Sequence, residues 1–442
     1  MASDSSIQVR LEKGPAFEGW MIANLAQGAG FSAFVALLIP PYITKTTGNA
    51  ADAGVVMAII SLAAVSGPVI GGFADRYRAH RLIMSLGILG MAISFLAFGI
   101  SALSNAFFAI DAIVMGLSVA AVLAVAPVFI VGANLGQALQ AKRLTTYNLV
   151  APVGQVVGGV LLGAAAAAGW DFSRRFYLAA AVMLVAFLIT WFTSKQAAQR
   201  VNAAMDAAQS PDADEGTAEE AAENLKKARN TGLKQVLFST FGLFLLILIL
   251  SSVANNGVNN QISNILPNVY GIDETTTAGL ISLAGLLNIG FFLVAGTWMG
   301  RSGAFGPFAI GNVARLVGTL GLALLGLVAN APILIVAAFM QLLYQGNPFV
   351  RLTQPVLAVR FAPIPAGQAN GWVIGASAIG SFVGSILGGL LADSIGFNAI
   401  NWMAAIAAGL AVLLIFISLW PAERKKRAEE EAALASATAE PA

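Results

Sequence analysis

The sequence has no cysteine, a single histidine and few charged residues. Without cysteine it can form no disulfide, no thiol nucleophile and no thiolate metal site. His80 alone cannot build a zinc or haem centre, so we expect no metal and no cofactor. Only 10% of the residues are charged and 58% are hydrophobic, whereas a soluble domain has about 25% charged residues. This composition excludes a soluble protein and indicates an integral membrane protein.

The apolar residues are grouped in segments long enough to cross a bilayer. A spanning helix needs about 20 mainly apolar residues. By this rule the sequence predicts twelve spans, and an even number leaves both termini on the same side. We expect them at about 18–42, 52–74, 82–103, 106–130, 145–168, 175–194, 234–264, 276–299, 308–329, 332–350, 367–391 and 399–420.

The basic residues predict the orientation. Of the 24 Lys and Arg, three (Lys45, Arg174 and Arg175) fall on the side opposite the termini and one, Arg315, inside a span. The other twenty lie on the side of the termini, which the positive-inside rule places in the cytoplasm. The net charge of +2 thus reflects membrane topology, and we expect the lipid bilayer rather than nucleic acid as partner.

A long polar stretch separates the first six spans from the last six. Its acidic centre predicts a mobile linker, and 219–229 can form a short surface helix. We also expect a basic, finally disordered tail. The predicted divisions are 1–17 (cytoplasmic N-terminal segment), 18–194 (first six-helix half), 195–233 (cytoplasmic linker), 234–420 (second half) and 421–442 (cytoplasmic tail).

The two halves repeat each other at a nearly constant offset. Gly154, Gly158 and Gly163 recur 226 residues later, and Pro40 and Pro267 are 227 apart. Six spans repeated in parallel place the halves the same way up, with a site between them near the middle of the membrane. Secondary transporters have this architecture.

The loop between the second and third spans reads Gly-Gly-Phe-Ala-Asp-Arg-Tyr-Arg from Gly71. It resembles the signature loop of the major facilitator superfamily, Gly-x-Leu-Ala-Asp-Arg-x-Gly-Arg-Arg, with Phe73 for leucine and Arg78 for glycine. The resemblance implies an all-α membrane protein with twelve transmembrane helices in two pseudo-symmetric halves. It also implies that Asp75 contacts the N-terminus of the eleventh helix, near Gly367, when the cytoplasmic side closes. The gating residues it implies are Gly71, Asp75, Arg76 and Arg301.

Charges inside the membrane are costly and usually functional. Asp111 lies within the fourth span, as a coupling carboxylate or a structural one. Arg315 is close enough to the cytoplasmic end to extend to the surface; the alternative is that it binds substrate. Glu18 borders the first span as an interfacial residue or a proton site, and we expect His80 to be a solvated loop residue. The central cavity should therefore have almost no fixed charge.

Amide side chains are common where charges are absent. The seventh span contains four asparagines within six residues, which cover about half the helix circumference. Such amides either bind substrate or join helices by hydrogen bonds. The candidate substrate-binding residues are Asn24, Gln27, Gln155, Asn255, Asn256, Asn259, Asn288, Gln341, Tyr344, Gln345 and Trp372.

These features predict a secondary transporter rather than an enzyme, because no catalytic constellation or nucleotide-binding loop is present. We expect a monomer in the cytoplasmic membrane that moves a small neutral polar solute, sugar- or polyol-like, with a proton or another ion as possible coupling partner. One alternative is export of amphipathic drugs or lipid-like compounds. Another is a membrane scaffold or receptor without transport, in which the asparagines of the seventh span would affect stability alone.

Overall fold

The computed structural model describes residues 14–100, 104–133, 135, 137–208, 236–364 and 366–439. Within them every regular element is a helix, and 12 are long and apolar enough to cross a membrane. The fold class expected from the sequence is confirmed. Most of the linker, including the helix expected at 219–229, lies outside the described residues.

The first half has six spans. They are formed by η1 (Gly19–Met21), α2 (Ile22–Gln27), η2 (Gly28–Val35) and α3 (Ala36–Thr47); α4 (Ala50–Ala63), η3 (Ala64–Ser66) and α5 (Gly67–Arg76); α6 (His80–Ile100); α7 (Asn105–Val125) and α8 (Val128–Val131); α9 (Gln137–Ala167); and α10 (Phe172–Thr193), followed by α11 (Lys195–Ala208).

The second half repeats this order. Its spans are α14 (Thr240–Asn259) with α15 (Ile262–Tyr270); α16 (Glu274–Ser302); α17 (Phe305–Leu325); α18 (Ile333–Phe361); α19 (Ala366–Ser394); and α20 (Asn398–Leu414) with η4 (Ile415–Leu419) and α21 (Trp420–Ala439). The tail was expected to be disordered at its end, but it continues the last span as a helix to Ala439.

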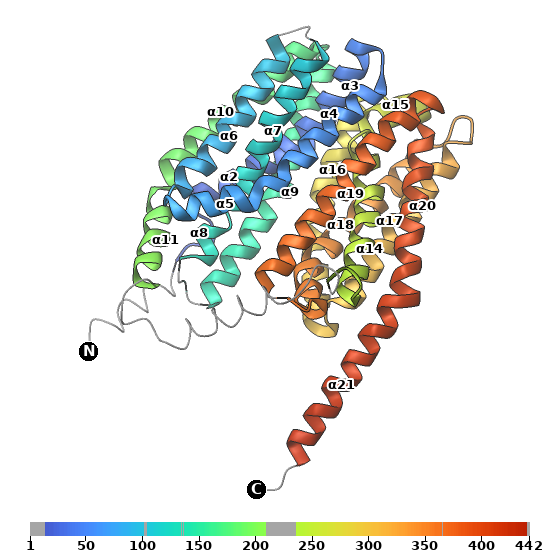
Figure 1. Ribbon diagram of the computed structural model, residues 1–442. Helices are drawn as coiled ribbons and strands as arrows, with labels where there is room; N and C mark the ends of the chain where they lie inside the picture. The colour runs from blue at the N-terminus through green and yellow to red at the C-terminus, as the bar shows by residue number, and fades with distance from the viewer. Residues whose placement is uncertain are drawn as a thin grey trace.

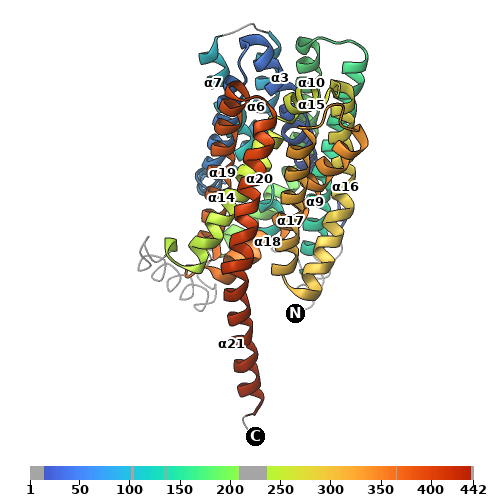
Figure 2. The same cartoon turned by 90° about the vertical axis from the view of Figure 1, so that its right-hand side faces the viewer.

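Figure 1 shows the halves side by side, and α21 projects from the bundle beyond the end of α20 (Figures 1 and 2). We call the end of the bundle from which α21 projects the terminal face, and the opposite end the far face. The first span begins at the terminal face because the number of spans is even. Two helix pairs, α4 with α19 and α9 with α16, join the halves along their length.

Glycines allow these helix pairs to approach closely. A Cβ added to Gly389 of α19 would lie 2.9 Å from the carbonyl oxygen of Ala50 and 3.0 Å from the Cα of Gly54, both at the start of α4. In the other pair, a Cβ on Gly285 of α16 would lie 2.9 Å from the carbonyl oxygen of Pro152. Small residues at such crossings let backbones pack against each other in a membrane, where the hydrophobic effect does not drive helix association.

Three helices that start at the far face, α4, α10 and α16, are capped by the side chain of the residue just before them. Asn49 accepts a hydrogen bond from the backbone N–H of Ala51 at 2.7 Å, and Asp171 accepts one from Arg174 at 3.0 Å. Asp273 does the same for Thr276 at 2.9 Å. Each cap satisfies a backbone donor that the first turn of a helix leaves unpaired. The polar residues between spans therefore determine where the helices begin.

Candidate functional site

The hydrogen bonds that join the two halves gather toward the far face. Ser263 at the start of α15 donates to the carbonyl oxygen of Ala36 at 2.6 Å, and Asn264 donates to Thr44 at 3.0 Å. The helices involved, α3 and α15, lie side by side at that face (Figure 1). Nearer the middle, Ser61 and Ser381 are hydrogen-bonded at 2.8 Å. This conformation is therefore closed at the far face.

A carboxylate that the sequence reading did not identify strengthens this closure. Asp393, near the end of α19, accepts hydrogen bonds from the backbone N–H groups of Ala50 at 2.7 Å and Ala51 at 2.8 Å. These are orphan donors at the N-terminus of α4, where the helix dipole also favours a negative charge. Arg175 and Glu274 form an ion pair between α10 and α16 on the same face.

The seventh span is interrupted where its asparagines are densest, and many residues of the candidate site lie next to this interruption. The break at Asn260 and Gln261 separates α14 from α15, although the sequence predicted one continuous span. The side chains of Asn255, Asn256 and Asn259 are half-buried near the end of α14. Tyr344 of α18 donates to the Oδ1 of Asn259 at 2.5 Å, so the structure brings these two predicted residues together.

Several other predicted amides join helices in this conformation. Asn24 donates to the carbonyl oxygen of Tyr147 at 2.5 Å, and Gln155 donates across the halves to that of Ile281 at 3.1 Å. Gln341 donates to the carbonyl oxygen of Leu280 at 2.9 Å. Further hydrogen-bonding capacity remains unused, because oxygen atoms of five amides are buried without a partner among the described residues: Gln27, Asn202, Asn288, Gln345 and Asn401.

Trp372 lies apart from the asparagines. It lines an apolar groove of about 610 Å³ with Pro68 of α5 and residues of α14 that include Leu246 and Ile249. Successive residues are about 100° apart around a helix, so Trp372 and Asn370, two residues apart, lie on nearly opposite sides of α19. The polar residues of α19 that meet the first half, such as Ser381, lie on the other side of the helix. The structure therefore does not place Trp372 with the amide cluster.

Arg315 corrects a prediction from the sequence. We expected it to extend to the membrane surface, but its side chain is only 5% exposed, in the middle of α17. It donates to the Oγ of Ser251 on α14 and to the Oδ1 of Asn347 on α18, both at 2.5 Å. Its Nε is buried without a partner. Extension to the surface is impossible because the guanidinium is held between three helices.

Arg351 gives a second correction. The sequence predicted that the tenth span ends at 350, but α18 continues to Phe361, so Arg351 lies within the span. Its side chain is exposed, and it lies close to Arg315 and to Tyr147 of the first half. Because Arg351 belongs to the second half and lies close to Tyr147 of the first, it faces the space between the halves. The expectation of a central region with almost no fixed charge was therefore wrong.

The two proposed coupling carboxylates have different surroundings. Asp111 on α7 is 5% exposed, beside Ser94 of α6, and its Oδ2 is unpaired. Glu18, just before the first span, forms ion pairs with Arg143, at 2.6 Å, and with Arg200. Burial alone would raise the pKa of Glu18, but hydrogen bonds from Arg200 and Trp20 and the two positive charges lower it overall. A carboxylate that stays ionised is a poor proton carrier.

The signature loop has its own geometry in this conformation. The Nε2 of His80 is 2.7 Å from the Oδ1 of Asp75, and His80 is 1% exposed, so the expectation of a solvated histidine was wrong. It is buried because it begins α6 and packs against Phe129. Arg78 has a φ of 52°, in the left-handed region, which explains why glycine is usual at this position of the signature.

The remaining predicted gating residues are less constrained. Arg76 lies over the ring of Tyr77, and Arg301 is exposed in the last turn of α16. A Cβ on Gly71 would be in ordinary contact with Ala124 of α7 at 3.9 Å, so this conformation does not require glycine there. No described hydrogen bond joins Asp75 to α19. The gating role of these residues stays a prediction about another conformation.

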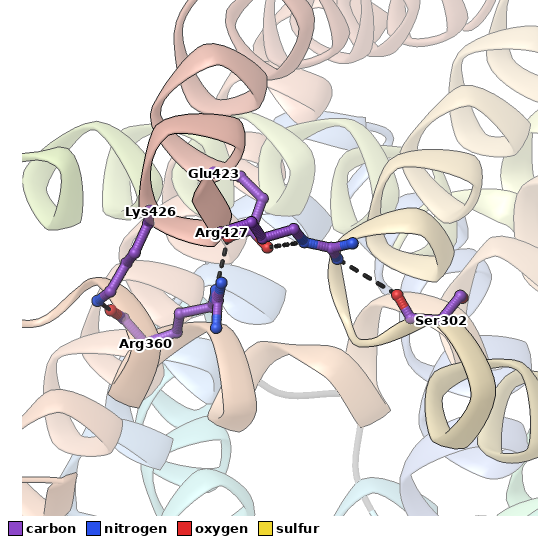
Figure 3. A network of polar contacts seen from close by, with 5 residues as sticks. All are labelled: Ser302, Arg360, Glu423, Lys426 and Arg427. Atoms are coloured by element: carbon purple, nitrogen blue, oxygen red, sulfur yellow. Dashed lines mark hydrogen bonds and ion pairs between the residues drawn. The ribbon is translucent and has the colours of Figure 1, made fainter. Parts of the chain in front are cut away.

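The terminal face of the second half is held by α21. Glu423 accepts hydrogen bonds from the Nε atoms of Arg360 at 2.6 Å and Arg427 at 2.7 Å (Figure 3). Lys426 donates to the carbonyl oxygen of Arg360, and Arg427 to that of Ser302 at 3.3 Å. These contacts attach α21 to the ends of α18 and α16. No group of histidine and acidic residues that could hold a metal ion occurs in the described chain.

Comparison with known proteins agrees with this architecture. Residues 20–364 match the sequence model of the Major Facilitator Superfamily, and the chain belongs to this family. It is a secondary transporter by family and fold. A search of curated proteins finds no significant match.

Solved structures with the same fold transport different solutes. A nucleoside transporter, NupG, has a TM-score of 0.67 at 15% identity, covering 90% of this chain and 96% of its own. A D-xylose–proton symporter gives 0.66 at 15% identity, with coverages of 90% and 96%. A peptide transporter, POT, in complex with sulfate gives 0.68 at 14% identity, with 92% and 94%. At these identities the likeness establishes the fold but not the solute.

Proposed function

We propose that the protein carries a small polar solute across the cytoplasmic membrane, through a site between its halves that opens to one face at a time. The observation that carries this proposal is the half-buried set Asn255, Asn256 and Asn259 beside Tyr344, in a conformation whose contacts between halves gather at the far face. Amides and hydroxyls both donate and accept hydrogen bonds, so they suit a solute rich in hydroxyl groups, such as a sugar or polyol.

The terminal face is assigned to the cytoplasm. The basic residues that the structure describes at this face include Arg78, Arg143, Arg200 and Arg427, in agreement with the positive-inside rule. With this assignment the far face is the outer face, and the conformation described here is inward-facing. The transport cycle then requires the contacts of Asp393 and Ser263 at the outer face to break while the signature loop closes the inner one.

Proton coupling would involve Asp111. It is buried within α7, six residues after the helix begins at Asn105, and it has an unpaired oxygen. Glu18 is less suitable because its ion pairs lower its pKa. Asp111 would act through movement of α6 against α7, since it lies between these helices and not beside the asparagines.

Export of amphipathic compounds is the second candidate function, and one observation favours it. The apolar groove beside Trp372 lies between the halves, bordered by α5, α14 and α19. A hydrophobic solute from the bilayer could enter there. This function predicts efflux of dyes or drugs, which sugars do not inhibit.

Uptake into proteoliposomes tests the two functions directly. Labelled sugars and polyols should accumulate or exchange in vesicles that contain the protein, and the double variant Asn255→Ala with Asn256→Ala should slow this by at least about tenfold, because each lost hydrogen bond weakens binding. Its melting temperature should change little, whereas Gln155→Ala, which removes a bond between halves, should lower it. Dye efflux without solute uptake would support the second function. A change in stability with no flux of either kind would indicate a scaffold.

A further inference from the structure

Two positive charges lie inside the bundle, and none of the acidic residues that the structure describes lies close to them. Arg315 and Arg351 lie on adjacent helices, α17 and α18, and interact electrostatically. Neither takes part in a described ion pair. Asp111, the buried acidic residue of α7, lies in the other half between α6 and α7, six residues after α7 begins. Arg315 is buried without an anionic partner, which is costly, and charges held inside a membrane in this way are usually functional.

Arg315 is fixed by packing as well as by hydrogen bonds. A Cβ on Gly346 would lie 2.9 Å from the Cγ of Arg315 and 2.5 Å from the carbonyl oxygen of Gly311, so glycine makes room for the side chain. Ser251, which accepts from Arg315, donates in turn to Asn312 at 2.5 Å, and Asn312 donates to the carbonyl oxygen of Phe308 at 2.9 Å. A continuous chain of hydrogen bonds thus leads from the guanidinium of Arg315 through Ser251 and Asn312 to the backbone of Phe308.

This arrangement determines which way Asn347 points its amide. Its Oδ1 accepts from Arg315, which leaves its Nδ2 as a donor that no described hydrogen bond uses. Asn347 is half-buried, and Arg351 follows it by one helical turn on α18. The Nδ2 of Asn347 and the charged guanidinium of Arg351 are thus two neighbouring hydrogen-bond donors. Arg315 behind them increases the positive potential.

Tyr147 shows which way Arg351 faces. It belongs to α9 in the first half, lies beside Trp20 with ring centroids 6.0 Å apart, and is close to Arg351 of the second half. Arg351 is exposed although it lies ten residues before the end of α18 at Phe361. Since about 1.5 Å of helix separates successive residues, its Cα is about 15 Å inside that end. The guanidinium therefore lines the central space.

From this geometry we infer that the transported solute carries an anionic group, a carboxylate or a comparable acid, which Arg351 binds together with the Nδ2 of Asn347 while Arg315 holds Asn347 in place. This inference rests on the proposed transport function and narrows its substrate class. A guanidinium is planar and offers two parallel donors that fit a carboxylate. The asparagines of α14 bind the neutral, hydroxylated part, so a hydroxy acid or sugar acid fits better than a neutral sugar.

Matched solutes test the inference in the purified full-length protein. Gluconate and sorbitol differ mainly in the acidic group, as do glucuronate and glucose, and lactate, citrate and phosphonoacetate extend the acids. We expect one or more acids to raise the melting temperature and to bind in calorimetry, and their neutral counterparts to bind at least about tenfold more weakly. Counterflow in proteoliposomes should show the same preference.

Variants test whether acid binding depends on Arg351 itself or only on the overall charge of the protein. Arg351→Gln should weaken binding of the acid about 10–100-fold, and Arg351→Lys less, since it keeps the charge and loses the planar pair of donors. Asn347→Ala should weaken it as well. Lys425→Gln is the matched control, because it removes an exposed charge outside the bundle and should leave binding unchanged.

Each outcome decides the matter. Acid binding that Arg351→Gln abolishes while Lys425→Gln retains it supports the inference. Transport of a neutral solute that Arg351→Gln leaves unchanged would overturn it and leave the transport function intact. Binding of no acid in the set would overturn it too, whereas absence of any flux, of acids, neutral solutes or dyes, would contradict the transport function itself. If Arg351→Gln does not fold, Arg351→Lys and Asn347→Ala carry the test.

Discussion

At the scale of single residues, the polar side chains of this bundle belong to three groups with different tasks. Glu18, with its two arginines, joins parts of the first half at the terminal face. Asn24 and Gln155 join helices to each other. Asn259 and Tyr344 lie together on the helices that border the central space. The residue type alone does not tell which group a polar side chain belongs to, because the groups differ in the residues that these side chains contact.

Asp75 provides a prediction at this scale. In the present conformation it is paired with His80 and its side chain is 58% exposed. If it meets the N-terminus of α19 when the terminal face closes, Asp75→Asn should slow transport about two- to fivefold, since a charge at a helix N-terminus contributes about 0.3–1 kcal/mol. Expression and melting temperature should stay the same. Initial rates in proteoliposomes measure this.

The control for this variant is Asp206→Asn, which removes an exposed partner of Arg78 near the same loop. Its transport rate should remain at the wild-type value. Equal rates for Asp75→Asn and the wild type would remove the gating role.

At the scale of helices, the crossing of α4 and α19 combines close packing with a charge contact. Gly54 and Gly389 let the two backbones meet, and Asp393 binds the first N–H groups of α4 from the end of α19. Both features act where the halves touch in the far-face-closed conformation. Neither would be possible after the halves rotate apart at that face. The crossing is therefore a place where a substitution should shift the equilibrium between conformations.

Gly389→Val should open the far face. The added side chain would meet the carbonyl oxygen of Ala50, which is backbone and cannot move aside. Ser263→Cys reports the change, because Ser263 is 6% exposed in the closed form and the protein has no other cysteine. We expect labelling by a membrane-impermeant maleimide to rise several-fold in the Gly389→Val background.

Gly290→Val on α16 serves as the comparison, since a Cβ there meets nothing within 4 Å. Labelling of Ser263→Cys should be as slow in this background as in the otherwise unchanged protein. Equal labelling in the Gly389→Val and Gly290→Val backgrounds would show that the glycine crossing does not control the far face.

At the scale of the whole molecule, two halves with the same order of spans lie side by side and meet through two helix pairs (Figure 2). Most described hydrogen bonds lie within a half, while those between the halves are few and gather toward the far face. The halves can therefore move as bodies without losing their internal packing. The distribution of the basic residues predicts which side faces the cytoplasm.

Cysteine labelling in intact cells tests that orientation. Thr275→Cys would report the far face and Lys425→Cys the terminal face; both positions are exposed. An impermeant reagent should label the first in intact cells and the second only after permeabilisation, because nineteen of the 24 basic residues are assigned to the terminal side once Arg351 is placed inside α18. The opposite result would invert the orientation and make the conformation outward-facing.

The sequence alone determined the membrane class, the twelve spans and the family, because long apolar segments and a signature loop are local properties. Helix ends were less certain: Arg351 was placed outside its span because a charge usually marks the end of an apolar run, although α18 continues to Phe361. Residues 209–235 of the linker lie outside the described part, so their expected behaviour stays a prediction.

Only the tertiary structure decided which polar residues share a space. Arg315 reads in the sequence as a charge near a membrane surface, and nothing local reveals that Ser251 and Asn347, 64 and 32 residues away, hold it inside. Asp393 likewise has its partners at Ala50 and Ala51, more than 340 residues earlier. Such pairings depend on how helices from distant parts of the chain pack. For this reason composition specified the bilayer as the environment, while packing determined the charge of the central site.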